Sequence, residues 1–191
     1  MARETREFPI SRTVQKQNRL RAKPLKFSRD VESDWTIKND KPHYGLKEHA
    51  SVDINHGFLL ATEITPASHH DSLYLPYCTA ASCHTEQPIG KVYADKGYFG
   101  EPNRSFLSLN HIEDGIMRKD TKTAKITHLE KERNKRISKK RYMVEQYFGL
   151  SHLYHGAFRA RFFRIIAHVI DVMFRQMVFN LFRGSKILVT A

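Results

Sequence analysis

A short apolar run that ends in an acid and a glycine constrains this fold more than any other stretch. The run is Val92-Tyr93-Ala94, and Asp95-Lys96-Gly97 follow it directly. Such a run is typical of a buried strand that brings its last side chain, here a carboxylate, to the open edge of a sheet. The sequence therefore predicts a strand that ends at Asp95.

A second acid, Glu145, lies within a helical pattern in which Val144, Phe148 and Leu150 are expected to form the buried side. Glu145 could then face Asp95 across a cleft. Hard cations such as Mg²⁺ bind charged oxygen ligands, so two carboxylates on rigid elements would supply half or more of a divalent-metal site. The alternative is structural, with Asp95 capping a turn and Glu145 pairing with a nearby arginine.

Strands and short helices are predicted around the Asp95 strand. A hairpin is expected from Tyr44 to Thr65, because apolar and polar residues alternate on both sides of the turn residues Asn55-His56-Gly57. Its polar face is expected to carry Lys47, His49, Ser51 and Asp53. Short helices are predicted at residues 71–82 and 103–109, and a brief strand at residues 115–117.

The chain is strongly basic, with a formal net charge of +12 over 191 residues. This charge indicates a polyanionic partner, most simply nucleic acid, with an anionic membrane surface as the rival. Residues 118–141 hold eleven bases and three acids and lead directly into the Glu145 helix. That density suits DNA that passes close to the site, and the alternative is a solvated surface. No run of about 18 apolar residues and no signal peptide is found, so a cytoplasmic protein is expected.

Residues 162–182 carry apolar side chains at helical intervals and predict a helix that packs in the core, with Gly184 ending it. A membrane or partner helix is the alternative there. Cys78 and Cys83, with three histidines nearby, raise the question of a zinc site. A second cysteine pair is absent from the sequence, so two reduced thiols are the better interpretation.

Four blocks of sequence, in the same order, carry a resemblance to a known family. They are Tyr44-Gly45-Leu46-Lys47-Glu48-His49, Thr65-Pro66-Ala67-Ser68-His69-His70-Asp71, Asp95-Lys96-Gly97-Tyr98 and the stretch from Arg141 to Gly149. Together they resemble bacterial insertion-sequence transposases of the DDE type, with an IS4-like catalytic domain, in the branch named after insertion sequence five. The resemblance covers about residues 30 to 183.

The resemblance implies an α/β, ribonuclease-H-like fold, a mixed sheet flanked by helices, that cuts and joins DNA. Asp95 and Glu145 would be the catalytic and metal-binding residues, for two Mg²⁺ or Mn²⁺ ions in a complete site. The implied DNA contacts are Lys96, Lys139, Lys140, Arg141 and His152. The family usually has Tyr and Lys where this sequence has Ser138 and His152, and histidine is a weaker cation near neutral pH.

The resemblance also calls for a first catalytic Asp on a central strand before the Tyr44 block, and no acid there ends an apolar strand. We therefore expect a chain that lacks this strand and does not work alone as a transposase. The expected parts are a basic arm or linker at residues 1–41, the catalytic domain at 42–184 and a tail at 185–191. Alternatives are a DNA-binding remnant without catalysis and a basic metal-dependent nuclease. Expected partners are the DNA of element ends and target, with a homodimer left open and no membrane, in a nucleoid-associated location.

Overall fold

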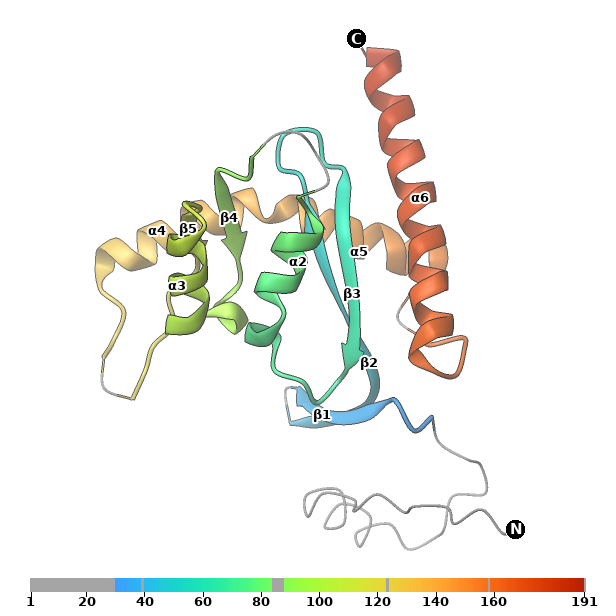
Figure 1. The fold of residues 1–191 in the computed structure, drawn as a ribbon, viewed down its shortest axis with the longest axis horizontal. Helices are drawn as coiled ribbons and strands as arrows, with labels where there is room; N and C mark the ends of the chain where they lie inside the picture. Colours follow the sequence, from blue (N-terminus) through green and yellow to red (C-terminus); the bar gives the residue numbers. More distant parts are fainter. Residues whose placement is uncertain (1–29, 39, 84–87, 123, 158, 191) are drawn as a thin grey trace, which may run out of the picture.

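The structure is a computed structural model that describes residues 30–38, 40–83, 88–122, 124–157 and 159–190. Most of the expected basic arm lies outside these residues. Strands and helices are mixed along the chain, so the expected α/β class is confirmed. The strands form one antiparallel sheet of three and one separate parallel pair, with helices on both sides (Figure 1).

The antiparallel sheet has the order β1-β2-β3, from β1 (Asp34–Lys38), β2 (Lys41–Val52) and β3 (Leu59–Pro66). The predicted hairpin is confirmed as the β2 and β3 pair, with Leu46 opposite Pro66 and Ser51 opposite Ala61. The turn between them is fixed by Asp53, whose carboxylate accepts the backbone N–H of Asn55 and of His56. The aspartate therefore satisfies backbone donors that the turn leaves without a strand partner.

The parallel pair consists of β4 (Lys91–Ala94) and β5 (Glu113–Ile116), which α3 (Glu101–Leu109) connects. The predicted strands at Asp95 and at residues 115–117 and the predicted helix at 103–109 are confirmed within a few residues. The buried core beside this pair is formed by four apolar residues, Leu75, Ala94, Leu107 and Ile116. Ala94, the last residue of β4, is thus held in the core directly before Asp95.

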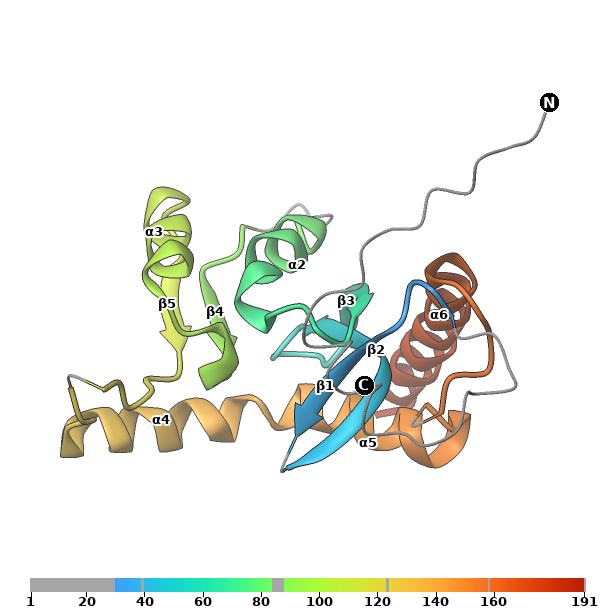
Figure 2. The same cartoon turned by 90° about the horizontal axis from the view of Figure 1, so that it is seen from below.

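Helices cover the strands from two sides, as Figure 2 shows. On one side lie α3 and α2 (Leu75–Ala81), which the short 3-10 turn η1 (Asp71–Leu73) precedes. On the other side lie α4 (His128–Lys140) and α5 (Tyr142–His155), which follow each other with a bend at Arg141. β2 therefore has a helix on each side, α2 and α5, whereas β1 lies beyond the helices (Figure 1).

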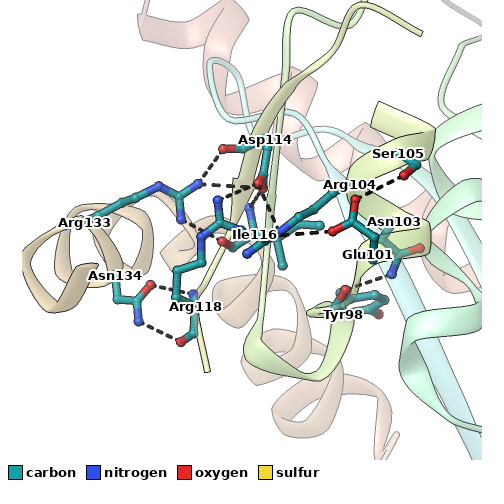
Figure 3. A network of polar contacts seen from close by, with 10 residues as sticks. All are labelled: Tyr98, Glu101, Asn103, Arg104, Ser105, Asp114, Ile116, Arg118, Arg133 and Asn134. Atoms are coloured by element: carbon teal, nitrogen blue, oxygen red, sulfur yellow. Dashed lines mark hydrogen bonds and ion pairs between the residues drawn. The ribbon is translucent and has the colours of Figure 1, made fainter. Parts of the chain in front are cut away.

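A polar network fastens α4 to the end of β5 (Figure 3). Arg118 pairs with Asp114 at 3.0 Å, and Arg133 donates to the backbone oxygens of Ile116 and Asp114 at 2.8 and 2.5 Å. Asn134 accepts from the backbone N–H of Arg118 and donates to its carbonyl oxygen. Two of the eleven bases in the basic run are thus used to hold the fold together. The rest of α4 then projects toward the exit of β4.

The last helix, α6 (Ile165–Thr190), differs from its prediction in two ways. It is not a core helix, because only His168 and Val172 are buried, whereas Phe174 and Leu181 are 63% and 72% exposed. It also continues through Gly184, which an interior helix position tolerates at a cost of about 1 kcal/mol. Residues 165–189 are long and apolar enough to cross a membrane, with a mean hydropathy of 1.4 and 11% of that window buried.

Two elements lie across the expected domain boundaries, which stay a prediction. β1 pairs with β2 through residues 34–38, within the expected arm of residues 1–41. α6 runs to Thr190 and so includes residues of the expected tail at 185–191. Strand pairing and helix continuity reach across both boundaries, which composition alone does not reveal.

Candidate catalytic site

Asp95 lies where β4 ends and the 3-10 turn η2 (Lys96–Tyr98) begins. Its backbone is extended, and its carboxylate accepts the backbone N–H of Lys96, which caps the turn. The side chain is 52% exposed. One carboxylate oxygen, Oδ1, accepts the hydrogen bond that caps the turn. The other oxygen, Oδ2, takes no part in this cap.

Glu145 lies in the first turn of α5, with a side chain that is 62% exposed. The buried residues of this helix are Met143, Tyr147 and Ser151, so the predicted buried side of Val144, Phe148 and Leu150 is out of phase. The cause is Tyr147, which is fully buried and donates its hydroxyl to Glu48 of β2. A tyrosine with a partner inside the protein packs as well as an aliphatic residue.

Arg141, at the bend between α4 and α5, lies between the two acids. Its guanidinium nitrogens are 3.8 Å from a carboxylate oxygen of Asp95 and 3.9 Å from one of Glu145. The arginine side chain is 19% exposed, whereas both carboxylates are more than half exposed. Pairs of this length and exposure add little stability. What they show is that one cation balances two acids from elements that are fifty residues apart in sequence.

Both acids lie on the wall of one cavity of about 440 Å³. The cavity is bounded by β2, β4, α2 and α5, and Arg141 and Lys140 also line it. This size is within the range of ligand-binding pockets. The two predicted carboxylates are therefore found on one cavity, which spacing in the sequence could suggest but not establish.

A buried histidine, His49, contacts the turn that follows Asp95. The sequence predicted this histidine on the polar face of the hairpin. His49 of β2 is 4% exposed, with Nδ1 at 2.9 Å from the hydroxyl of Tyr98 and Nε2 at 3.1 Å from Thr65 Oγ1. Burial lowers the pKa of His49, and the nearby Asp71 opposes that shift. His49 and Tyr98 each lie in one of the sequence blocks described above, but no local pattern in the sequence pairs them.

Of the residues expected to contact DNA, Lys140 and Arg141 line the cavity. Lys96 is exposed in η2, Lys139 and Lys140 are exposed in the last turn of α4, and His152 is exposed on α5, seven residues after Glu145. Seven residues are two helical turns, so His152 and Glu145 lie on the same side of α5. We call Lys96, Lys139, Lys140 and His152 the basic rim, of which Lys140 lies on the cavity wall and Lys96 directly follows Asp95.

The donor groups at the site meet part of what a divalent cation requires. Two carboxylates match the oxygen ligands of Mg²⁺ or Mn²⁺, but a third ligating side chain is not found among the described residues. The Arg141 guanidinium also takes up charge that a cation would neutralise. The site thus fits a divalent ion in part. Cys78 and Cys83 do not form a disulfide with each other.

Comparison with known proteins agrees with the family resemblance. The transposase DDE domain family matches residues 11–181. The chain is 35% identical, over 160 residues, to the transposase for insertion sequence element IS1106 of Neisseria meningitidis serogroup B. That match covers 83% of this chain and 54% of the relative, so the chain spans about half of the relative's length. No solved structure matches. The chain belongs to the transposase DDE domain family.

Proposed function

We propose that this chain is the catalytic part of an insertion-sequence transposase, which cleaves and joins DNA strands. The observation that carries this proposal is the position of Arg141 between Asp95 and Glu145 on one cavity wall. The two exposed carboxylates come from a strand exit and a helix, and one guanidinium balances both. A metal ion that binds both carboxylates would take the place of that guanidinium. The similarity to an insertion-sequence transposase supports the same function.

In this proposal Asp95 and Glu145 hold Mg²⁺ or Mn²⁺, with two ions in a complete site. When bound, such ions would supply Lewis-acid activation of water and stabilise negative charge on the leaving oxygen of a phosphodiester. Arg141 keeps the two carboxylates from repelling each other before the metal binds, and it then turns to a phosphate. Lys96, Lys139, Lys140 and His152 bind the DNA backbone along the basic rim.

The proposed arrangement is ribonuclease-H-like. An antiparallel hairpin, a parallel pair and helices on both sides of the strands support it. DNA of element ends and target is the proposed partner, in the cytoplasm with the nucleoid, and pairing of two copies would bring two element ends together.

The decisive experiment measures Mg²⁺-dependent cleavage of DNA that carries the element ends. Asp95→Asn and Glu145→Gln should each reduce cleavage by at least a hundredfold while DNA affinity changes less than threefold. Glu132→Gln is the matched control, because this exposed acid of α4 lies outside the site. Unchanged cleavage in both site variants would refute the assignment.

A second candidate function, DNA binding without cleavage, is favoured by one observation. Among the described residues only two carboxylates, rather than three ligating side chains, meet at the site. In that case the wild-type chain binds DNA with a steep salt dependence but shows no Mg²⁺-dependent cleavage. The slope of log affinity against log salt then counts the phosphates that the basic rim neutralises.

A further inference from the structure

The outer side of α6 is one continuous apolar face, and α6 lies at the outer side of the molecule (Figure 1). A helix turns by about 100° per residue, so a sector of about 140° holds eight large apolar side chains and no charged one. They are Ile166, Ile170, Met173, Phe174, Met177, Val178, Leu181 and Leu188, which are between 49% and 81% exposed. Monomeric proteins rarely expose an apolar patch of more than a few hundred Å².

The middle of this face has the spacing of a coiled coil. Seven residues follow one another at alternating intervals of three and four, namely Ala167, Ile170, Phe174, Met177, Leu181, Gly184 and Leu188. This repeat of about 3.5 residues keeps one stripe of a helix directed at a second helix. The stripe continues for about three heptads, the length at which such a pattern indicates a coiled coil.

The fold of one copy does not explain why residue 184 is a glycine. A Cβ at Gly184 would meet its nearest neighbour, Phe58, at 3.8 Å, which is an ordinary contact distance. Its φ is not among the positive values of the chain. Alanine would therefore fit here, and it would favour the helix by about 1 kcal/mol. A glycine that its own chain does not require suits the close approach of another chain.

Antiparallel pairing of two copies places this glycine opposite the largest side chain of the stripe. In the register that uses the most of the stripe, Met177 lies opposite Leu181 of the partner subunit. Phe174 then lies opposite Gly184 of the partner subunit. The two-fold axis passes at the level of Phe179, close to the middle of α6. Large and small side chains thus face each other across the seam, as they do in a packed core.

The size of the face matches what a stable dimer requires. A large aromatic side chain buries about 150–250 Å², and the eight side chains are about half or more exposed. Together they present roughly 900 Å² on each copy, whereas a standard interface buries about 800 Å² per partner. A hollow of about 520 Å³ beside Met177 and Leu181 lies at the centre of this pairing, where the same residues of the partner subunit would fill it.

Two other occupants fit the face less well. α6 cannot cross a membrane while Arg175, Asn180 and Arg183 bond to the hairpin. A helix that lies in a membrane surface carries lysine and arginine beside its apolar face, but both arginines of α6 bond to the hairpin instead. Residues 1–29 carry eleven charged side chains, with at most four residues between one and the next. Covering an uncharged face with that segment would bury charge without partners, which is costly.

We propose that the apolar face of α6 is the interface between two copies of this chain, paired antiparallel with Met177 opposite Leu181 of the partner subunit. The same patch is used on both copies, so association stops at two. None of the residues that line the cavity of Asp95 and Glu145 comes from α6, so the dimer leaves two such cavities accessible.

The test is sedimentation equilibrium of the full chain without DNA or metal, so its result is independent of the proposed cleavage. The wild-type chain should form dimers with a Kd of about 10 µM or tighter. Met177→Lys and Leu181→Glu should each raise this Kd at least a hundredfold. Leu129→Glu, a matched change of a residue that is 74% exposed on α4, should leave Kd unchanged. Circular dichroism confirms that the variants fold.

A mixture of the two interface variants tests the register. In a mixed dimer the lysine of Met177→Lys lies opposite the glutamate of Leu181→Glu, while the second contact of this kind stays apolar. The mixture should therefore associate at least tenfold more tightly than either variant alone. Ile170→Lys is the control, because Ile170 lies opposite Leu188 of the partner subunit. Mixed with Leu181→Glu, it should not restore association.

Gly184→Ala separates the stability of the helix from the interface. In the Met177→Lys background, which is monomeric, it should raise the Tm because alanine favours the helix. In the wild-type background it should raise the Kd of the dimer at least fivefold, because the added methyl group meets Phe174 of the partner subunit. An unchanged Kd would contradict the proposed register.

Three further results would overturn the proposal. A wild-type chain that stays monomeric at about 100 µM would show that the face does not bind a second copy. Dimers that persist in both Met177→Lys and Leu181→Glu would use another face. Binding of a monomeric wild-type chain to phosphatidylglycerol vesicles, lost in Leu181→Glu, would assign the face to a lipid surface.

Discussion

The two sides of the paired part of the hairpin, residues 46–52 of β2 and β3, have different neighbours. At Leu59 of β3, Asn180 of α6 accepts the backbone N–H and donates to the backbone carbonyl, both at 2.8 Å, and Gln176 donates to the same carbonyl at 3.3 Å. The opposite edge, at Glu48 and Ala50 of β2, borders a cavity instead. One edge is closed by side-chain amides that act as a strand neighbour would, while the other stays available for pairing.

This difference explains why α6 lies with its polar side inward. Arg175, Gln176, Asn180 and Arg183 all bond to the hairpin, through Glu48, Leu59 or the turn at His56. Most of the large apolar residues of α6 consequently face outward, with Val172 as a buried exception. A helix that satisfies a sheet edge must present donors and acceptors to it, because buried backbone groups without partners are costly.

The largest expected change in stability comes from proline substitutions, one in each strand of the hairpin. Ala61→Pro removes an N–H that the register assigns to the ladder between β3 and β2, and should lower the free energy of unfolding by about 3 kcal/mol. Ala50→Pro removes an N–H on the open edge and should cost less than about 1 kcal/mol. Urea denaturation measures both, and equal losses would show that the edge of β2 is not open.

The next largest change in stability is expected from the ion pair between Arg175 of α6 and Glu48 of β2. Arg175 lies 3.3 Å from Glu48 and 3.1 Å from Asp171, and the Arg175 and Glu48 side chains are 11% and 14% exposed. Arg175→Leu leaves Glu48 charged and nearly buried, which should cost about 2 kcal/mol. Adding Glu48→Gln should recover part of the loss. Arg183→Leu, which removes a contact with the exposed turn, is the control and should cost less than about 0.5 kcal/mol.

A smaller loss is expected when the amide of the closed edge is removed. Asn180→Leu leaves the N–H of Leu59 without an acceptor, which should cost about 1.5 kcal/mol, while Gln176 still donates to the carbonyl. Asn180→Asp keeps the acceptor and should be closer to wild type. If the two variants are equally stable in urea, the amide does not close the edge.

The smallest expected effect is the contribution of His49, which lines the cavity, to the pH dependence of stability. Burial lowers the pKa of His49 in the folded chain, so the unfolded chain binds the proton more readily. This contribution to stability is complete above the unfolded pKa of about 6.5 and is lost as the pH falls from there toward the folded pKa. His49→Gln, which keeps a polar partner for Tyr98, should show a shallower decline of melting temperature below pH 6.5. An identical decline of melting temperature in both proteins would show that His49 does not cause this pH dependence.

Predictions from the sequence succeed where residues close in sequence determine the local structure. The hairpin follows from alternation around Asn55-His56-Gly57, and the exit at Asp95 follows from an apolar run before a glycine. The spacing of Arg141 and Glu145 places them on one side of a helix turn, and the structure finds them 3.9 Å apart. These signals depend on neighbours within about ten residues.

Predictions fail where a distant partner selects the outcome. Periodicity shows which residues of α6 share a side, but the partner at Leu59, 121 residues away, decides that the polar side packs inward. Likewise Tyr147 is buried because it reaches Glu48, which is 99 residues away. Whether Asp95 and Glu145 act as metal ligands stays a prediction, since their geometry describes a charge arrangement and not a reaction.

The bond between Leu59 and Asn180 has a consequence for synthesis on the ribosome. The two residues are 121 positions apart, and bacterial and other ribosomes add roughly 5–20 residues per second. The hairpin can therefore emerge about 6–24 seconds before the side chain that closes its outer edge. Throughout that interval the nascent chain presents an uncovered strand to its neighbours. Slow translation between Leu59 and Asn180 would therefore raise the risk of aggregation and make chaperone contact at this hairpin most useful.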